Sequence, residues 1–166
     1  TVEQIKDSFR MAREVGLDNI NMDLIMGLPE EDFEDVRNTM EELKAMDPDN
    51  ITIHSLAIKR AARLNMFKED YKDMQMVNTQ EHMDLCADYC KEMGLEPYYL
   101  YRQKGMAGNM ENVGYAKKGK AGVYNILIME EKQTIMALGA GATTKFVLQE
   151  TNPDGSRRIE RVENVK

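Results

Sequence analysis

Residues 19–29, with the sequence NINMDLIMGLP, decide the expected fold, because they predict a buried strand with an acid in its middle. Alternate side chains of a strand point to opposite faces of its sheet. The apolar face consists of Ile20, Met22, Leu24 and Met26, and the polar face of Asn19, Asn21, Asp23, Ile25 and Gly27. A buried, unpaired carboxylate is costly, so Asp23 needs a hydrogen-bonding partner, a hydrated cavity or a ligand. We interpret the polar face as the lining of a binding site.

The composition is that of an ordinary globular protein. The chain has 166 residues, 42% of them hydrophobic and 31% charged, which fits one domain. A net charge of −7 argues against a broad nucleic-acid interface. No apolar run approaches the roughly 20 residues of a membrane span, and no leader sequence opens the chain. We expect a soluble, cytoplasmic protein without nucleic-acid or membrane partners and, because Thr1 stands in place of Met, a fragment of a longer protein.

Helices are predicted on both sides of the first strand. Thr1 and Gln4 form a capping box that begins a helix, and Gly16 ends it. Apolar residues spaced three or four apart over residues 33–43 predict a second amphipathic helix. A turn over residues 47–50 ends that helix. The pattern helix, strand, helix is typical of an α/β fold.

A second strand over residues 50–58 repeats the split between an apolar and a polar face, with Thr52 and His54 on the polar face. A third helix is expected over residues 78–93, and it leads into a third strand that contains residues 98–101. Successive helix and strand units predict parallel strands with right-handed crossover helices. Three such units do not close a barrel.

The second part of the chain has a different pattern of residues. Residues 105–122 contain five glycines and predict a long connection. The apolar run over residues 124–129 fits either a strand or a short helix. The end of the chain predicts a β-hairpin, with strands over 145–150 and 157–162 and a turn over 152–155.

The two cysteines, Cys86 and Cys90, have the spacing that opens an iron–sulfur motif, but Met93 stands where the third cysteine would fall. Both lie on the apolar stripe of the predicted third helix, where a free cysteine behaves as a small hydrophobic residue. A disulfide between them would distort the helix. We interpret both as core side chains, so this chain alone would supply no metal ligands.

Three stretches of sequence together carry a resemblance to a known family. They are residues 21–29 (NMDLIMGLP), residues 98–116 (YYLYRQ followed by ENVGYA), and residues 138–142 (LGAGA). In this order they resemble the radical S-adenosylmethionine oxygen-independent coproporphyrinogen III oxidase family, above all its coproporphyrinogen dehydrogenase branch. The resemblance implies that residues 1–104 are the C-terminal part of an incomplete (β/α) barrel of the radical SAM type. Residues 105–166 would begin the accessory region, a smaller α+β extension that ends in the hairpin.

The resemblance implies two cofactors, S-adenosyl-L-methionine and a 4Fe–4S cluster. The family's cluster loop is absent from this chain, so we expect the fragment to be inactive alone. The family's acid that contacts S-adenosylmethionine falls on Asp23, which otherwise would be a structural carboxylate. Gly27 would allow close approach of the cofactor or be an ordinary turn glycine. The family's Gly-x-Gly-Ala motif falls on Gly139, Gly141 and Ala142, which would line the mouth of the site or form a tight turn.

The implied reaction of the complete enzyme is oxidative decarboxylation of coproporphyrinogen III propionates to give protoporphyrinogen IX in heme biosynthesis. An electron donor protein would be its partner. Propionates require cations, and polar residues that follow the second and third strands are the candidates for substrate binding. They are Lys59, Arg60, Arg63, Arg102 and Gln103. The alternative is that these side chains are solvated surface charges.

Two other functions remain open for this sequence. One is a heme-binding chaperone of the same family, and the other is a radical SAM enzyme with a different substrate. An incomplete barrel also leaves strand edges exposed, so a homodimer of the fragment is a further hypothesis.

Overall fold

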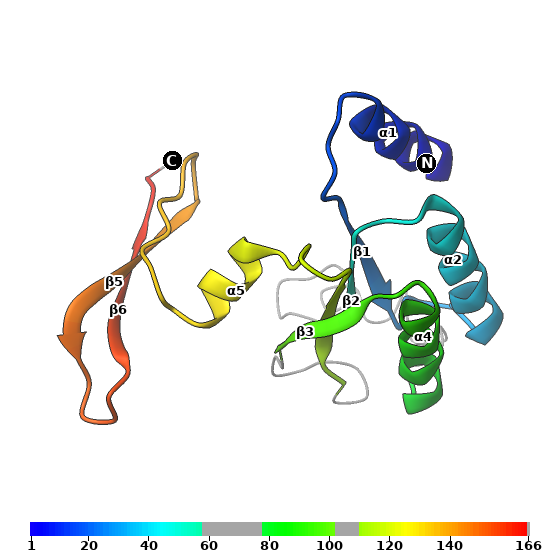
Figure 1. Cartoon of the computed structure of the whole chain (residues 1–166). Coiled ribbons are helices and arrows are strands. Elements are labelled where there is room, and N and C mark those ends of the chain that lie inside the picture. The colour runs from blue at the N-terminus through cyan, green and yellow to red at the C-terminus, as the bar shows by residue number, and fades with distance from the viewer. Residues whose placement is uncertain (58–77, 102–109, 166) are drawn as a thin grey trace. The chain divides into compact units, whose positions relative to one another are not determined.

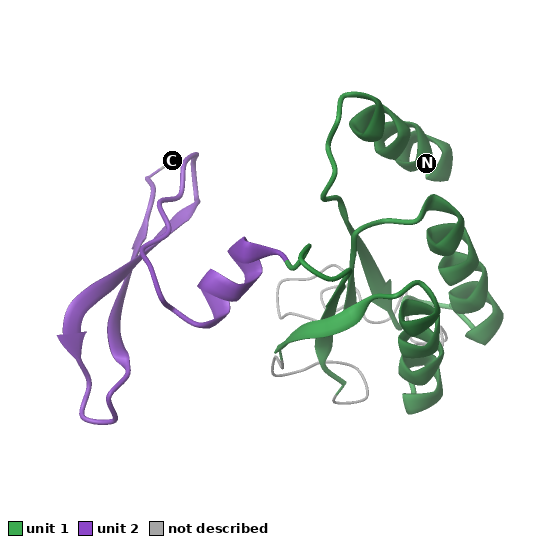
Figure 2. Ribbon diagram, in the orientation of Figure 1, with its two compact units in different colours: residues 1–121 green, residues 122–166 purple. Residues whose placement is uncertain are grey.

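The structure is a computed structural model that describes residues 1–57, 78–101 and 110–165 (Figure 1). The chain forms two compact units, Thr1–Ala121 and Gly122–Lys166, which are coloured separately in Figure 2. This division follows contacts between residues. The predicted boundary at residue 104 separates the barrel from the accessory region of the family, and it stays a prediction.

The first unit consists of three described helices and a four-stranded sheet. Its elements are α1 (Val2–Glu14), β1 (Asn21–Met26), α2 (Phe33–Met46), β2 (Asn50–Ser55), α4 (Gln80–Glu92), β3 (Glu96–Tyr101) and β4 (Asn112–Ala116). The second unit contains α5 (Val123–Met129), β5 (Thr143–Thr151) and β6 (Arg157–Glu163).

The helices begin at side chains that bind otherwise unpaired backbone groups. Thr1 and Gln4 form the predicted capping box of α1. Asp32 caps α2 in the same way. The predicted start of α4 at Asn78 is wrong by one residue, since Thr79 is the cap. Asn78 instead donates a hydrogen bond of 3.0 Å to the hydroxyl of Ser55 and so connects this end of α4 to β2.

The sheet is mixed, with the strand order β1-β2-β4-β3. β1 and β2 are parallel as predicted, whereas β4 runs antiparallel to both β2 and β3. The three predicted strands β1, β2 and β3 thus run in the same direction, but the prediction of a purely parallel sheet is wrong, because β4 lies within the segment that we predicted to be a long connection. β4 occupies the place beside β2 that β3 would have taken. The described residues form an α/β fold with a mixed sheet.

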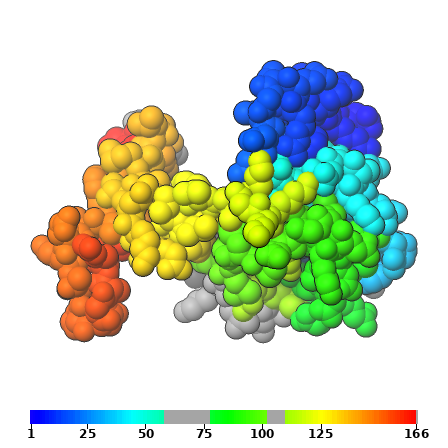
Figure 3. Space-filling view, in the orientation of Figure 1, coloured from blue at the N-terminus to red at the C-terminus, as the bar shows by residue number. Residues whose placement is uncertain are grey.

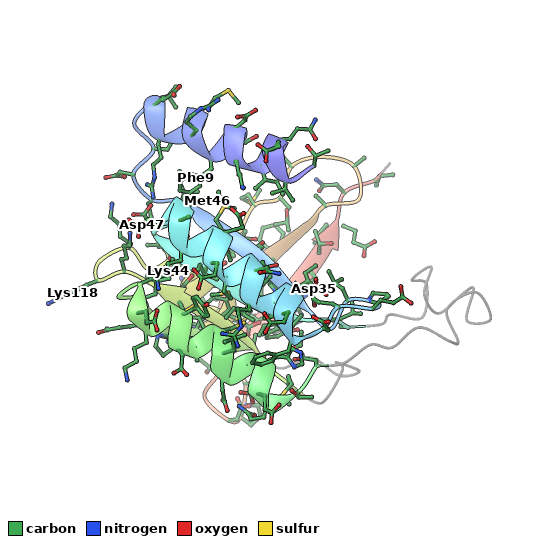
Figure 4. All side chains as sticks on the ribbon, turned by 90° about the vertical axis from the view of Figure 1, so that its right-hand side faces the viewer. Phe9, Asp35, Lys44, Met46, Asp47 and Lys118 are labelled. Atoms are coloured by element: carbon green, nitrogen blue, oxygen red, sulfur yellow. The ribbon has the colours of Figure 1, made fainter. Side chains whose placement is uncertain are left out.

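The core lies between one face of this sheet and the helices. Figure 4 shows α1, α2 and α4 side by side in front of the strands, and the space-filling view in Figure 3 shows the same succession. Met26, Ile51 and Ile53 from the strands are fully buried, together with Met40 of α2 and Cys86 of α4. Burial of such side chains contributes about 1.5–3 kcal/mol each, so this face supplies most of the stability of the unit.

Helix α1 packs less deeply than the other two helices. None of its residues is fully buried. Lys6 forms an ion pair of 2.7 Å with Glu42 of α2, and Phe9 and Met46 lie between the two helices in Figure 4. Arg13, near the end of α1, pairs with the buried carboxylate of Asp49 at 2.6 Å. Polar contacts thus attach α1 to the rest of the unit.

The second unit is a short helix followed by the predicted hairpin. The run over residues 124–129 lies in α5, so the helical alternative is correct. β5 and β6 pair antiparallel and are joined by a turn that contains Asn152 and Gly155. Lys145 of β5 forms an ion pair of 2.6 Å with Glu131. Among the described residues, no helix is both long enough and apolar enough to span a bilayer.

Candidate functional site

The face of the sheet opposite the core is polar and open. In β1, Leu24 and Met26 are buried, whereas Asn21, Asp23 and Ile25 are exposed, which confirms the predicted alternation. The parallel register pairs Asp23 with Thr52 and Ile25 with His54. Side chains paired in this way lie on the same face of a sheet. The two strands therefore share one polar face, as the sequence predicted.

Asp23 lies on the open face in the edge strand β1. Its side chain is 64% exposed, so the carboxylate is in contact with solvent. The reason is that the described helices cover β1 on its apolar face only. The carboxylate nevertheless has the expected partner, since Asn21 Nδ2 donates a hydrogen bond of 2.6 Å to Asp23 Oδ1. His54 Nε2 lies 3.8 Å from the same oxygen.

A row of residues crosses the sheet from Asp23 to the opposite edge. Asp23 pairs with Thr52, Thr52 pairs with Gly114, and Gly114 pairs with Tyr99. Thr52 Oγ1 donates a hydrogen bond of 3.0 Å to Asn21 Oδ1. Burial raises the pKa of Tyr99, and a hydrogen bond with Thr52 opposes that rise. Side chains of β1, β2 and β3 thus form one polar network, and Gly114 of β4 lies between Thr52 and Tyr99 in the row.

A pocket of about 370 Å³ opens beside Asp23. Its lining residues are Asp23, Ile25, His54, Ser55, Leu56, Ala57 and Asn112. This volume is in the range of small-molecule sites, which combine apolar walls with a few polar groups. Within the pocket the carboxylate can accept hydrogen bonds from hydroxyl groups or bind a cation, and the apolar side chains can pack against a ring.

Gly27 ends β1 next to this pocket and has a φ of 82°, which favours glycine. The backbone N–H groups of Gly27 and Leu28 donate to Glu31 Oε2 at 3.2 and 3.4 Å. Burial raises the pKa of Glu31, while these two hydrogen bonds lower it. Glu31 therefore stabilises the turn, and contact between Gly27 and a cofactor stays a prediction.

Gly139, Gly141 and Ala142 form a turn at the base of the hairpin in the second unit. Gly141 N–H donates to the carbonyl of Asn164 at 3.2 Å, and Ala142 N–H donates to Gly139 at 3.3 Å. The Asn164 side chain donates to the carbonyls of Ala137 and Gly139. These contacts correspond to the tight-turn alternative, since both amides are bonded within the unit. A place for these residues at the mouth of the site stays a prediction.

The five residues predicted to bind substrate lie outside the described residues. They are Lys59, Arg60, Arg63, Arg102 and Gln103. Their role stays a prediction.

Cys86 and Cys90 are fully buried free thiols, which confirms the prediction that they are core side chains. Burial raises the pKa of each thiol to about 12. Cys86 Sγ lies 3.9 Å from the sulfur of Met26. In the described parts of the chain, no group of three or more histidine, cysteine or acidic residues is placed to bind a metal ion.

Sequence reasoning placed Asn21 and Thr52 on the polar face but did not assign them a role, and it missed Tyr99 and Gly114. An available signal was Gly114 between β-forming residues, because a glycine inside a strand often marks the close approach of another group. That Tyr99 is the group beside this glycine follows only from the pairing of β4 with β3, which the sequence did not reveal.

The sequence matches no protein-family model. Over 151 residues it is 42% identical to the oxygen-independent coproporphyrinogen-III oxidase-like protein HemZ of Bacillus subtilis. This match covers 91% of this chain and 30% of that protein. Over 55 residues it is 36% identical to the oxygen-independent coproporphyrinogen III oxidase of Helicobacter pylori. This match covers 33% of this chain and 12% of that protein.

The fold is similar to that of coproporphyrinogen III oxidase (HemN) from Escherichia coli, which is described as a radical SAM enzyme. The TM-score is 0.59 and the identity 18%, and the match covers 86% of this chain and 33% of the other. The chain therefore spans about a third of the length of HemZ and of this structural neighbour.

Proposed function

The chain is homologous to part of the oxygen-independent coproporphyrinogen III oxidase family, and from this premise we propose that it forms one wall of an S-adenosylmethionine site. The complete enzyme would decarboxylate the propionates of coproporphyrinogen III in heme biosynthesis. The first unit would belong to an incomplete (β/α) barrel whose lumen is the open polar face of the sheet.

The observation that carries this proposal is the Asp23 carboxylate beside a pocket of about 370 Å³. S-adenosylmethionine has a positive charge and ribose hydroxyl groups, and both are complementary to a carboxylate. Because Asp23 is exposed, it binds such a ligand without the large desolvation cost of a buried acid. The apolar part of the pocket, including Ile25, suits an adenine ring.

The residues present fit S-adenosylmethionine but do not fit an iron–sulfur cluster. Cluster ligands are thiolates, whereas Cys86 and Cys90 are buried thiols with a pKa of about 12. The cluster ligands would come from a part of the enzyme outside this chain. When bound, the two cofactors supply the radical chemistry. Asp23 would orient the nucleoside, and Lys59, Arg60, Arg63, Arg102 and Gln103 would bind the propionates.

The test is an NMR titration of the isotopically labelled 166-residue chain with S-adenosylmethionine, because NMR also detects weak binding. We expect shift changes at Asn21, Asp23 and His54. Asp23→Asn should weaken binding about tenfold, which corresponds to about 1.4 kcal/mol. Asp88→Asn, which makes the same change at an exposed position of α4, should bind as the wild type does.

Two outcomes would contradict the proposal. One is a wild-type chain whose signals do not respond to S-adenosylmethionine, and the other is an Asp23→Asn variant with unchanged affinity. A titration of the same chain with heme addresses the chaperone alternative. Tight binding of heme to the open face in place of the nucleoside would favour that alternative.

A further inference from the structure

The row of residues that crosses the sheet ends at Tyr99, whose ring extends over the neighbouring strand. β3 is separated from β2 by β4, and the two strands approach each other across Gly114. A Cβ atom at Gly114 would lie 2.0 Å from Tyr99 Cε1 and 2.3 Å from Cδ1. Only glycine therefore allows the ring to lie directly on β4 and to reach Thr52.

The Tyr99 ring also packs against the ring of Tyr98. The two ring centroids are 5.0 Å apart, with an interplanar angle of 67°, which is a favourable edge arrangement. Burial raises the pKa of Tyr99 above its ordinary value near 10. At neutral pH the phenol therefore keeps its proton and can act as a hydrogen-bond donor.

The donors and acceptors between Thr52 and Asp23 have a fixed direction. Thr52 has a single hydroxyl proton, and it donates this proton to Asn21 Oδ1 at 3.0 Å. The same hydroxyl is also the hydrogen-bond partner of Tyr99. Because Asn21 Oδ1 is occupied in this way, Asn21 Nδ2 faces the carboxylate and donates to Asp23 Oδ1 at 2.6 Å. A flipped amide would place oxygen against oxygen.

We propose that Tyr99, Thr52 and Asn21 form a relay of positioning residues that fixes the orientation of the Asp23 carboxylate. In the described part of the chain, the contacts of Asn21 and His54 with Asp23 both fall on Oδ1. The relay thereby directs Oδ2 toward a ligand that donates hydrogen bonds or has a positive charge. The identity of this ligand rests on the proposed function, whereas the relay is a property of the fold.

The first test observes the relay without a ligand, through the side-chain amide of Asn21 in NMR spectra of the whole chain. In the wild type we expect slow solvent exchange and a shift away from that of a free amide. Tyr99→Phe and Thr52→Val should each accelerate exchange at least severalfold. Tyr101→Phe, on an exposed side chain of the same strand, is the matched control and should leave this signal unchanged.

A second signal distinguishes the relay from a general loss of structure. The hydrogen bond with Thr52 lowers the pKa of Tyr99, so Thr52→Val should raise this pKa further, as followed by a ¹³C titration of the phenol. Tyr99→Phe conserves the ring over Gly114 and so conserves the packing. An Asn21 amide that is identical in the wild type and in Tyr99→Phe would overturn the relay.

The third test measures affinity for S-adenosylmethionine. Asn21→Ala should weaken binding about tenfold and Tyr99→Phe about threefold, and Tyr99→Phe should have no further effect in the Asn21→Ala background. Additive effects of the two substitutions would overturn the relay. If the wild type does not bind S-adenosylmethionine while the Asn21 amide responds as expected, the relay is supported and the proposed function fails.

Discussion

The two faces of the four-stranded sheet have opposite roles, although adjacent residues of the same strands supply them. Met26 and Ile53 on one face are fully buried beneath helices, whereas Asp23 on the other is largely exposed. The covered face derives its free energy of folding from apolar burial. The open face buries Thr52 but little apolar surface, and it presents oriented polar groups. Neighbouring residues of the same strand thus serve different purposes, one stability and the next ligand recognition.

The largest effect is expected on the covered face. Ile53→Ala removes a fully buried side chain and should lower the free energy of unfolding by about 2–5 kcal/mol, because it leaves a cavity in the core. Urea denaturation followed by circular dichroism measures this change. A loss below about 1 kcal/mol would show that the covered face does not carry the stability of the unit.

Gly114→Ala sharpens the comparison, because it is the one change on the open face that we expect to be costly. The new methyl group would collide with the Tyr99 ring and should lower the free energy of unfolding by about 1–3 kcal/mol. The double variant Gly114→Ala with Tyr99→Ala should recover most of this loss. A double variant as unstable as the sum of its parts would contradict the close packing of ring and glycine.

The dependence of stability on pH should come from a buried acid at the end of the covered face. Burial raises the pKa of Asp49, but the hydrogen bond from Ile20 N–H and the ion pair with Arg13 outweigh it, so the pKa in the folded protein lies below the ordinary value. Asp49 therefore stabilises the fold fully above the unfolded pKa of about 4 and loses this effect as the pH falls through the folded pKa.

Free energies of unfolding measured from about pH 6 to about pH 2 would reveal this contribution. Asp49→Asn should be less stable than the wild type at pH 6, and the difference should shrink as the pH falls. A constant difference across the range would mean that the charge of Asp49 does not contribute. Asp154 is an exposed acid whose pKa is lowered by hydrogen bonds with Ser156. Asp154→Asn therefore shows, for comparison, how much of the pH dependence comes from an acid in a local turn.

The smallest effect is expected at the proposed site itself. Asp23→Ala should change the free energy of unfolding by no more than about 0.5 kcal/mol, since its side chain is exposed. Thermal unfolding measures this effect alongside Ile53→Ala. A loss as large as that of Ile53→Ala would remove the separation between the two faces.

The sequence predicted those features that depend on near neighbours. The capping box of Thr1, the alternation around Asp23 and the C-terminal hairpin each follow from residues close in the chain. The sequence did not predict β4, because the strand is short, contains Gly114, and forms only by pairing with strands that are distant in sequence. The contact between Tyr99 and Thr52 depends on that same register.

The sequence left the surroundings of Asp23 open between a partner, a hydrated cavity and a ligand, for a related reason. Alternation shows which face a side chain occupies but not whether a second layer covers that face. In the described structure the helices cover the apolar side alone, so the acid has a hydrogen-bonded partner and solvent together. The tight turn of Gly139 and Gly141 likewise depends on Asn164, about 25 residues further along the chain.

The position of β4 has a consequence for how the protein is made. This strand lies between β2 and β3, yet it is the last strand of the first unit to leave the ribosome. β1 and β2 can pair early, but among the described strands β3 has no partner until Asn112–Ala116 has been synthesised. Late pairing of distant segments is slow and leaves strand edges unpaired during synthesis. We therefore expect the first unit to fold in a single late step, after its last strand emerges.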